Sequence, residues 1–483
     1  MLATCRAWVK MSRLRLSTIV FRMAMRLLLR IRGMTPRGEH ENIGPSLSSS
    51  SQPAAGDNDF FVINHNQSDD RRELIVVLSA PYLCLVDVVR SMQACRTLRW
   101  DLPRTVRSVD CTGTSAQFSR KDARLQAYSR NRISNPSISN REVSLIVATF
   151  TQVVDLDVRW CHRVTSAVLP QIARLSNLCA LRMDSTRLAS INADALSCAQ
   201  GLEVLSLKSC TRITNIAAKA FPPSLKELYL SFSKVIDLVA LEVCTQLEVL
   251  DLGSSLATDI SPLKNCTALR VLHMNSSAVQ NLEPLGACVH LRALNLSGSK
   301  ASDFNLKLKG LEVLHLNRTR VASIEGLVGC PRLRTLSLDF APVSDVTALG
   351  SLACLRRVSL SATDVEDVTA LSTCSELDTV ILFDTRVRDV APLQHCKRLR
   401  ELNIDYTRVQ DVTALASCVL LKDLKIFNTR VVDISALAHV ERVSGFSLGH
   451  DAGEEGEDEE LHVYGSLHQH TAWEPATLIM EPL

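Results

Sequence analysis

The sequence predicts an α/β solenoid, a stack of similar coils in which each coil contributes one short strand to a parallel sheet. The first observation is a fixed period: LDTVILFDTRVRDVAPLQHC, LRELNIDYTRVQDVTALASC and LKDLKIFNTRVVDISALAHV begin at Leu377, Leu399 and Leu421, 22 residues apart. The second is the alternation of apolar and polar residues early in each segment. The third is composition, because 46% of residues are hydrophobic but only 4% are aromatic, which suits thin repeated layers. A period in the twenties is typical of solenoids.

Each coil begins with a short strand. If the first Leu is position 1, positions 1, 4 and 6 are apolar, as in Leu399, Leu402 and Ile404, while positions 3, 5 and 7 are mostly polar. That period of two predicts a strand with one buried face. Position 11 is usually Val or Ile and position 17 is usually Leu, which returns the chain to the core on the opposite side. One coil cannot bury such a layer alone, so the coils must stack.

The repeat runs through fourteen coils, from Val153 to a last copy at Val443, with 22 residues in most and 20 after Leu291. The first three spacings are 25, 24 and 23 residues. Recurrence of L-x-x-L-x-L in register resembles the leucine-rich repeat over roughly residues 150–450. The 22-residue length and DISPL at 259–263 are most similar to the internalin and phosphatase-regulator subclasses. This resemblance implies a horseshoe with a parallel concave sheet and short helical or 3-10 turns on the convex side.

Position 9 departs from those subclasses, because Ser or Thr stands where they carry Asn. A hydroxyl both donates and accepts, so we expect it to satisfy backbone groups of the loop. Thr at this position, with Cys near the end of the coil, resembles leucine-rich-repeat proteins of kinetoplastid protozoa. The residues of this column are Ser233, Ser255, Ser277, Ser299, Thr319, Thr363, Thr385, Thr407 and Thr429.

Asp recurs at position 13, just before VTAL, ISPL or VAPL. A carboxylate there is expected to cap the free N–H groups of one helical turn. The alternative, a stripe of metal ligands, is disfavoured because similar residues stacked in a solenoid are usually structural. We therefore expect no metal site and no cofactor. The column contains Asp237, Asp259, Asp303, Asp345, Asp367, Asp389, Asp411 and Asp433.

Cys recurs at position 20 and accounts for seven of the sixteen cysteines: Cys244, Cys266, Cys288, Cys330, Cys374, Cys396 and Cys418. Neighbouring coils lie about 5 Å apart, so disulfide distance is not excluded. A disulfide joins only two coils, however, whereas a small buried thiol fits every layer. We expect a buried ladder of reduced thiols.

A basic column at position 10 comprises Arg187, Lys234, Lys300, Arg320, Arg386, Arg408 and Arg430. The Asp column three residues further on offers pairing partners, which lessens the positive field. We interpret the column as a solvated flank. The net charge of +3 also gives no support for nucleic acid as a partner.

The last coils differ from the others at positions 3, 5, 7 and 8, which point out from the concave sheet. Exposed rings in a chain with so few aromatics predict a surface that binds a protein partner of unknown identity. The alternative is that the rings pack on the C-terminal flank as an intramolecular cap. The predicted partner-binding residues are Asp339, Phe340, Ile381, Phe383, Asp384, Asp405, Tyr406, Asp423, Lys425 and Phe427.

A weaker cluster lies at the start of the repeat: Asp155, Asp157, Arg159, Trp160, Tyr229 and Phe232. Residues 60–142 are predicted to flank it, and their helical-looking run at 72–104 could cap the open end of the core. The same run keeps a rival function open. Residues 161–183 and 202–215 resemble the cysteine-containing repeats of F-box proteins, which implies a substrate-recognition subunit of a ubiquitin ligase. Residues 72–104 lack a clear F-box beginning.

Catalytic motifs are absent from the sequence: there is no Walker loop, G-x-S-x-G, C-x-x-C pair or H-E-x-x-H. We therefore expect no enzyme, and interpret the chain as a non-catalytic protein–protein interaction scaffold that binds its partner on the concave face.

Composition divides the chain into a basic segment with a Ser-rich linker (1–59), a flanking region (60–142), the solenoid (143–450) and an acidic tail (451–483). Residues 1–38 hold eight Arg and one Lys without an acid, and only they are expected to contact a membrane. A mitochondrial transit peptide, a surface helix and no targeting role all remain open for them. Without a convincing secretory signal, we expect an intracellular protein, cytoplasmic unless residues 1–38 direct it to mitochondria.

Overall fold

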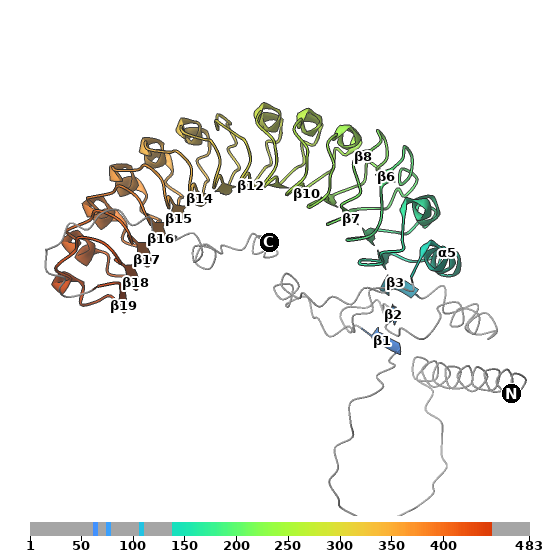
Figure 1. The fold of residues 1–483 in the computed structure, drawn as a ribbon, viewed down its shortest axis with the longest axis horizontal. Helices are drawn as coiled ribbons and strands as arrows, with labels where there is room; N and C mark the ends of the chain where they lie inside the picture. The colour runs from blue at the N-terminus through green and yellow to red at the C-terminus, as the bar shows by residue number, and fades with distance from the viewer. Residues whose placement is uncertain (1–60, 66–73, 79–105, 111–137, 447–483) are drawn as a thin grey trace, which may run out of the picture.

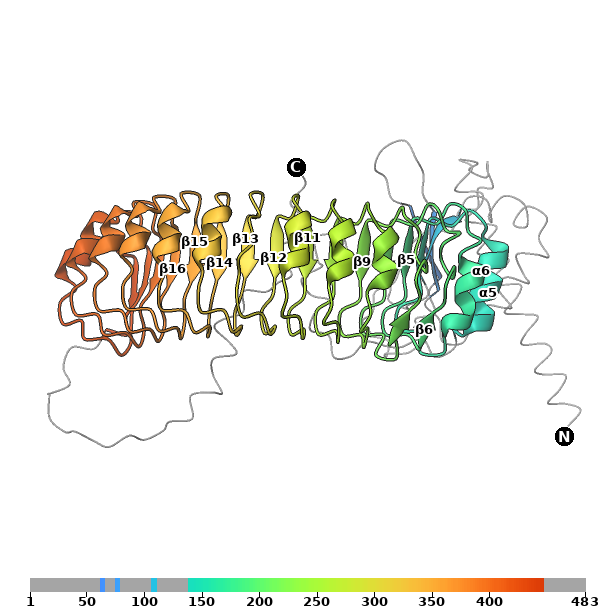
Figure 2. The same ribbon diagram turned by 90° about the horizontal axis from the view of Figure 1, so that it is seen from above.

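The computed structural model describes residues 61–65, 74–78, 106–110 and 138–446. They form an arch with strands on its concave side and short helices on its convex side (Figure 1). Seen from above, the coils lie side by side along one long axis (Figure 2). The arch is the leucine-rich-repeat solenoid that the sequence predicts.

Fourteen three-residue strands, one from each coil, run parallel along the concave face. Each strand of the 22-residue coils occupies positions 3 to 5. They are β4 (Asp155–Asp157), β5 (Ala180–Arg182), β7 (Val204–Ser206), β9 (Glu227–Tyr229), β10 (Val249–Asp251), β11 (Val271–His273), β12 (Ala293–Asn295), β13 (Val313–His315), β14 (Thr335–Ser337), β15 (Arg357–Ser359), β16 (Thr379–Ile381), β17 (Glu401–Asn403), β18 (Asp423–Lys425) and β19 (Arg442–Ser444).

The convex side carries one short helix in most coils. The first coils use α5 (Asn140–Thr149), η2 (Ser166–Val168) and α6 (Leu169–Ile172), with a two-stranded sheet of β6 (Ser190–Ile191) and β8 (Asn215–Ile216). Later coils use 3-10 helices: η3 (Val239–Val243), η4 (Ser261–Asn265), η5 (Glu283–Ala287), η6 (Glu325–Gly329), η7 (Thr347–Ser351), η8 (Thr369–Thr373), η9 (Ala391–His395), η10 (Thr413–Ser417) and η11 (Ser435–Leu437).

Strand register confirms the repeat, because position 4 pairs with position 4 of the next coil, as in Leu250 with Leu272. The start of the last coil differs from the predicted one. Val443 pairs with Leu424 and is therefore position 4, so this coil begins at Val440, only 19 residues after Leu421 (440 − 421). The coil is shorter because η11 has three residues where most of its neighbours have five.

The core is the set of apolar side chains at positions 1, 4, 6, 11 and 17, which are fully buried in almost every coil. Backbone hydrogen bonds join the coils on the concave side. Position 6 donates to the position-5 carbonyl of the next coil, as from Leu382 to Asn403 at 2.8 Å. Each layer therefore buries about five apolar side chains, at about 1.5–3 kcal/mol apiece for Val or Leu, only when its neighbours are present.

Side chains at two columns satisfy the loops as the sequence predicts. Asp389 accepts a hydrogen bond from the N–H of Ala391 at 2.7 Å. The equivalent bond, from the backbone N–H two residues further along the chain, is made to Asp237, Asp259, Asp345, Asp367, Asp411 and Asp433. Position-9 Thr hydroxyls donate to the position-6 carbonyl, as from Thr385 to Leu382 at 2.8 Å. The buried hydroxyls of Ser233, Ser255 and Ser277 make no such bond within the described residues.

Asp303 is the exception to the capping column, because its 20-residue coil has no convex helix between β12 and β13. Phe304 fills the shortened loop and is buried. The next coil then packs so closely that a Cβ on Gly326 would overlap the Phe304 carbonyl oxygen. Gly326 is therefore required at this contact, whereas Gly286 on η5 faces open space.

The position-20 thiols are buried, as predicted. Most of them point their Sγ at the position-17 carbonyl of the preceding coil, 3.4 Å from Cys396 to Leu371 and 3.3 Å from Cys418 to Leu393. All twelve cysteines of the described part are free. Burial raises the pKa of Cys396 to about 12 and that of Cys288 to about 11.

The flanking region extends the sheet. β3 (Val106–Asp110) pairs parallel with β4, β2 (Leu74–Leu78) pairs parallel with β3, and β1 (Phe61–His65) pairs antiparallel with β2. The helical prediction for 72–104 is wrong at β2, where LIVVL is rich in β-branched residues that favour strands. Its remainder at 79–105 lies outside the described residues, as do 1–60 and 447–483.

Helix α5 was not predicted, and it spans the expected boundary at 142. Ser139 and Glu142 form a capping box at its start, and Val143, Ile146 and Val147 are buried. Within the described part of the chain, no helix is long and apolar enough to cross a membrane.

Gly326→Ala should lower the free energy of unfolding by about 1–3 kcal/mol, because the new methyl group collides with a backbone oxygen that cannot move alone. Gly286→Ala is the matched control, with an expected change of less than about 1 kcal/mol. Urea unfolding followed by circular dichroism measures both. Equal effects would show that the short coil does not create a tight contact.

Thiol labelling should separate the buried column from the surface. With iodoacetamide at pH 8, exposed Cys354 should react at least about tenfold faster than Cys396, whose raised pKa leaves little thiolate. Peptide mapping by mass spectrometry reads each site. A column thiol that reacts as fast as Cys354 would contradict its placement in the core.

Candidate functional site

The concave edge is formed by position 8, where the backbone adopts positive φ in each of the first thirteen coils. Tyr406 has φ 58°, Phe340 φ 60° and Asp384 φ 53°. Such values are uncommon outside Gly. They are held because the position-8 N–H donates to the next coil, as from Tyr406 to the carbonyl of Phe427 at 2.8 Å. Position 8 carries a large side chain in only some coils, among them Arg318, Phe340 and Tyr406.

Three rings stack along the last coils. The Phe383 and Tyr406 centroids are 5.3 Å apart at an interplanar angle of 61°, and those of Tyr406 and Phe427 are 5.4 Å apart at 59°. These edge-to-face contacts are the preferred geometry for aromatic pairs. We call the three residues the ring ladder. Phe427 is 52% exposed, whereas Phe383 and Tyr406 are half-buried.

Phe340 lies apart from the ring ladder, with the Arg318 guanidinium 4.3 Å from its centroid. An open groove of about 570 Å³ lies between Phe340 and Tyr406. Its lining includes Ala362, Asp384 and Arg408. The structure therefore brings predicted residues from three coils, Phe340, Asp384 and Tyr406, to one groove.

The predicted carboxylates have different roles. Asp339 is buried and accepts from the Ser361 N–H at 3.0 Å and from the hydroxyls of Ser359 and Ser337 at 2.5 and 3.1 Å. Asp339 therefore supports the backbone and is not available on the surface, contrary to the prediction. The cause is that position 7 has no sheet partner for its N–H, so a neighbouring Asp or Asn caps it.

The same capping explains Asp405, which accepts the Phe427 N–H at 2.6 Å. Burial raises the pKa of Asp405, opposed by this hydrogen bond and by Lys425. Asp423 pairs with Arg442 at 3.0 Å. Asp384 is exposed, and no side-chain hydrogen bond or ion pair to it is found among residues 138–446. Ile381 and Lys425 are partly buried on the sheet.

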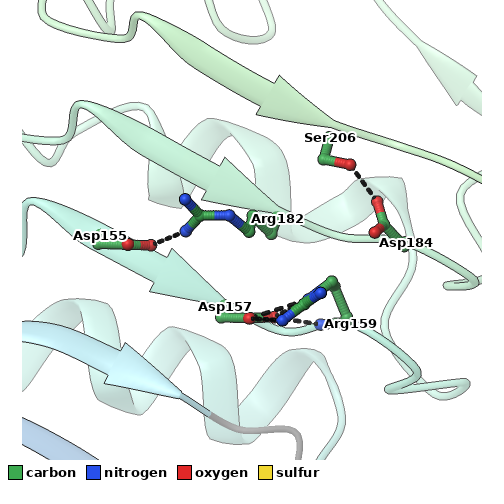
Figure 3. Close-up of polar contacts among 6 residues, drawn as sticks. All are labelled: Asp155, Asp157, Arg159, Arg182, Asp184 and Ser206. Atoms are coloured by element: carbon green, nitrogen blue, oxygen red, sulfur yellow. Dashed lines mark hydrogen bonds and ion pairs between the residues drawn. The ribbon is translucent and has the colours of Figure 1, made fainter. Parts of the chain in front are cut away.

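The charged residues of the early cluster are paired within the chain (Figure 3), whereas its Phe232 is 60% exposed. Arg182 pairs with Asp155 at 2.5 Å, Arg159 pairs with Asp157 at 2.6 Å, and the Ser206 hydroxyl donates to Asp184 at 2.5 Å. Burial raises the pKa of Asp184, opposed by that hydroxyl. These charges cancel within the chain and leave little for a partner.

Among the described residues, the buried histidines and the basic column do not form a reactive site. Burial lowers the pKa of His315 to about 4 and also lowers that of His273, so both imidazoles are neutral at pH 7. In the basic column, Arg386 pairs at 2.8 Å with Asp364, the position-10 residue of the preceding coil. Pairing with the Asp column is not found among the described residues. No cluster of three metal-ligating side chains occurs among them either.

Searches against known proteins add the fold context. No protein-family model and no curated protein sequence matches the chain. Among solved structures, an internalin of Listeria monocytogenes is similar with a TM-score of 0.53 and 21% identity, over 58% of this chain and 83% of that one. A leucine-rich-repeat protein of Leptospira interrogans gives a TM-score of 0.52 and 16% identity, over 61% and 83%. The chain has the leucine-rich-repeat fold.

Asp339→Ala should lower the free energy of unfolding by about 2–3 kcal/mol, because three donors lose one buried acceptor. Asp384→Ala, also on the concave side and two coils away, should change it by less than about 0.5 kcal/mol. Urea unfolding midpoints compare the two variants. A neutral Asp339→Ala would return this carboxylate to the candidate binding residues.

Proposed function

We propose that this chain is a non-catalytic scaffold that binds a protein partner on the concave face of its last coils. The observation that supports the proposal is the ring ladder, in which Tyr406 contacts both Phe383 and Phe427, with Phe427 exposed and the other two rings half-buried. Among the middle coils, the same positions carry Ser, Asn and Gly, such as Gly253, Ser276 and Ser297.

The physical reason is the energetics of binding surfaces. Aromatic residues dominate binding hot spots because they bury a large area at small entropic cost. Here the rings hold one another in place, and the backbone under Phe427 is fixed by Asp405. A partner would therefore meet a surface that is already ordered, which lowers the cost of association.

The alternative of a ubiquitin-ligase receptor receives no support from the described part of the flanking region. β2 and β3 pair with the solenoid sheet and continue it beyond β4. That arrangement favours an extension of the scaffold over a separate adaptor-binding domain in these two segments. The similarity of the 22-residue coils to the internalin subclass remains part of the proposal, since solved structures at this identity establish the fold alone.

The triple variant Phe383→Ala/Tyr406→Ala/Phe427→Ala should lose the partner that the unaltered chain captures from lysate. Val289→Ala/Val419→Ala/Val432→Ala is the matched control, because these side chains are 62%, 71% and 82% exposed at positions outside the concave face. Quantitative mass spectrometry of the captured proteins compares the three baits. Identical partner lists for both triple variants would refute a binding role for the ring ladder.

A further inference from the structure

The outer side of the last coil is apolar and incompletely covered among the described residues. Its apolar side chains pack against the core but are only half-buried. The equivalent residues one coil earlier are buried, with Val409 and Leu424 at 0% and Val412 and Leu421 at 1% exposure. The terminal repeat of a solenoid needs a polar outer side to stay soluble. We call this apolar side the terminal face, and it consists of Val431, Ile434, Val440, Val443 and Phe446.

The strand at the same end is an open edge. Within the described residues, β19 pairs with β18 and with no further strand. An uncovered edge strand presents free N–H and C=O groups that pair readily with another segment, so native proteins usually cover it. At the opposite end of the solenoid, β4 is covered by β3. The last coil lacks such a cover in the part of the chain that the structure describes.

The chain itself continues from the terminal face. Phe446 is the last described residue, and residues 447–483 follow it directly. Residues 451–460, DAGEEGEDEE, are too acidic to cover apolar side chains. Residues 461–480, LHVYGSLHQHTAWEPATLIM, contain Leu, Val, Ile, Met, Tyr and Trp with a single acid and no Lys or Arg. An apolar segment therefore follows shortly after an open apolar face.

The length of the connection allows this segment to return to the face. Fifteen residues lead from Phe446 to Leu461 (461 − 446), and they span at most about 50 Å. A tether of this length gives the segment an effective concentration of about 1 mM at the face, which favours it over a separate molecule. The other segments outside the described residues all precede α5, at the opposite end of the arch (Figure 1).

We propose that residues 461–483 of the same chain dock on the terminal face and along the β19 edge, and so close the core at this end. Apolar side chains of the segment would cover Val440 and Val443, and its backbone would pair with the groups of β19 that no described strand bonds. This contact does not depend on the proposed partner, because it lies on the end of the stack and not on the concave rings.

Closure of this end also supports the ring ladder. Gly445, with φ 84°, lies so close to Phe427 that a Cβ on it would overlap the Phe427 backbone. The Ile426 N–H donates to the Ser444 carbonyl at 2.9 Å. The last ring of the ladder therefore rests on β19, and a segment that holds β19 in place also fixes the position of Phe427.

Photo-cross-linking of the full chain tests which segment covers the face. Benzoylphenylalanine is placed at Phe446, whose ring it resembles, and an equal mixture of ordinary and heavy-isotope-labelled chains is irradiated. Mass spectrometry should find cross-links to peptides of 461–483, with both peptides of each pair carrying the same isotope. Pairs of mixed isotope would show that a second copy covers the face. Cross-links to residues 1–60, or to no residue beyond 460, would equally overturn the inference.

A second position for the cross-linker controls for random contact. Val289 is 62% exposed and lies in the middle of the arch. Benzoylphenylalanine at Val289 should not reach residues 461–483. Cross-links to that segment in equal yield from both positions would mean that it does not select the terminal face, and would overturn the proposed docking.

Hydrogen exchange of the full chain then measures what the contact does. Replacing apolar residues of the segment by Ser should speed amide exchange of residues 440–446 at least about tenfold, because β19 loses its cover. The two apolar variants are Leu461→Ser/Val463→Ser/Leu467→Ser and Leu478→Ser/Ile479→Ser/Met480→Ser. The matched control, His462→Ser/His468→Ser/His470→Ser, should leave that exchange unchanged, and β10 should be unaffected in all three. If neither apolar variant speeds the exchange, residues 461–483 do not close the solenoid.

Discussion

The register between successive coils is the constraint on which the rest of this structure depends. Position 4 pairs with position 4 from β4 to β19, and hydrogen bonds at positions 6 and 8 lock each coil onto the next. Each such bond contributes only about 0.5–1.5 kcal/mol, but the same bonds recur between all neighbouring coils and keep their strands in one register. A residue type required at one position in one coil is then required at that position in all of them. Columns of Leu, Asp, Thr and Cys are the consequence.

The same constraint decides where length can vary. Coils of 25, 24, 22 and 20 residues all keep their strands in register, so the differences appear on the convex side. The 25-residue coil accommodates α6, and the 20-residue coil loses its 3-10 helix and fills the space with Phe304. Convex loops do not carry the inter-strand bonds and can shorten or lengthen. The concave face remains continuous and suits a surface formed by several coils together.

Features that recur in many coils can be predicted from the sequence, which is why the predictions of the fold and of the capping Asp column are confirmed. A single Asp before VTAL is ambiguous, whereas the same Asp in seven coils bonds the same N–H group two residues on. The sequence does not predict the hydrogen bonds that a side chain makes with residues of a neighbouring coil. Asp339 looks like a surface carboxylate in its own segment, but its donors Ser359 and Ser361 lie 20 and 22 residues away. The positive φ at position 8 could not be predicted either, because Phe, Ser, Asp and Tyr do not indicate a left-handed backbone as Gly does.

Departures from the columns are therefore the informative residues in a solenoid of this kind. At the start of the repeat Asp155, Asp157 and the ring of Trp160 each meet an arginine, although Phe232 is exposed. At the other end of the arch, the rings of Phe383, Tyr406 and Phe427 contact one another, and no cation lies over them among the described residues. A row of rings with one fully exposed member adds little to the stability of an isolated protein. Its place on one ordered stretch of the sheet supports the proposal that a second molecule covers that surface.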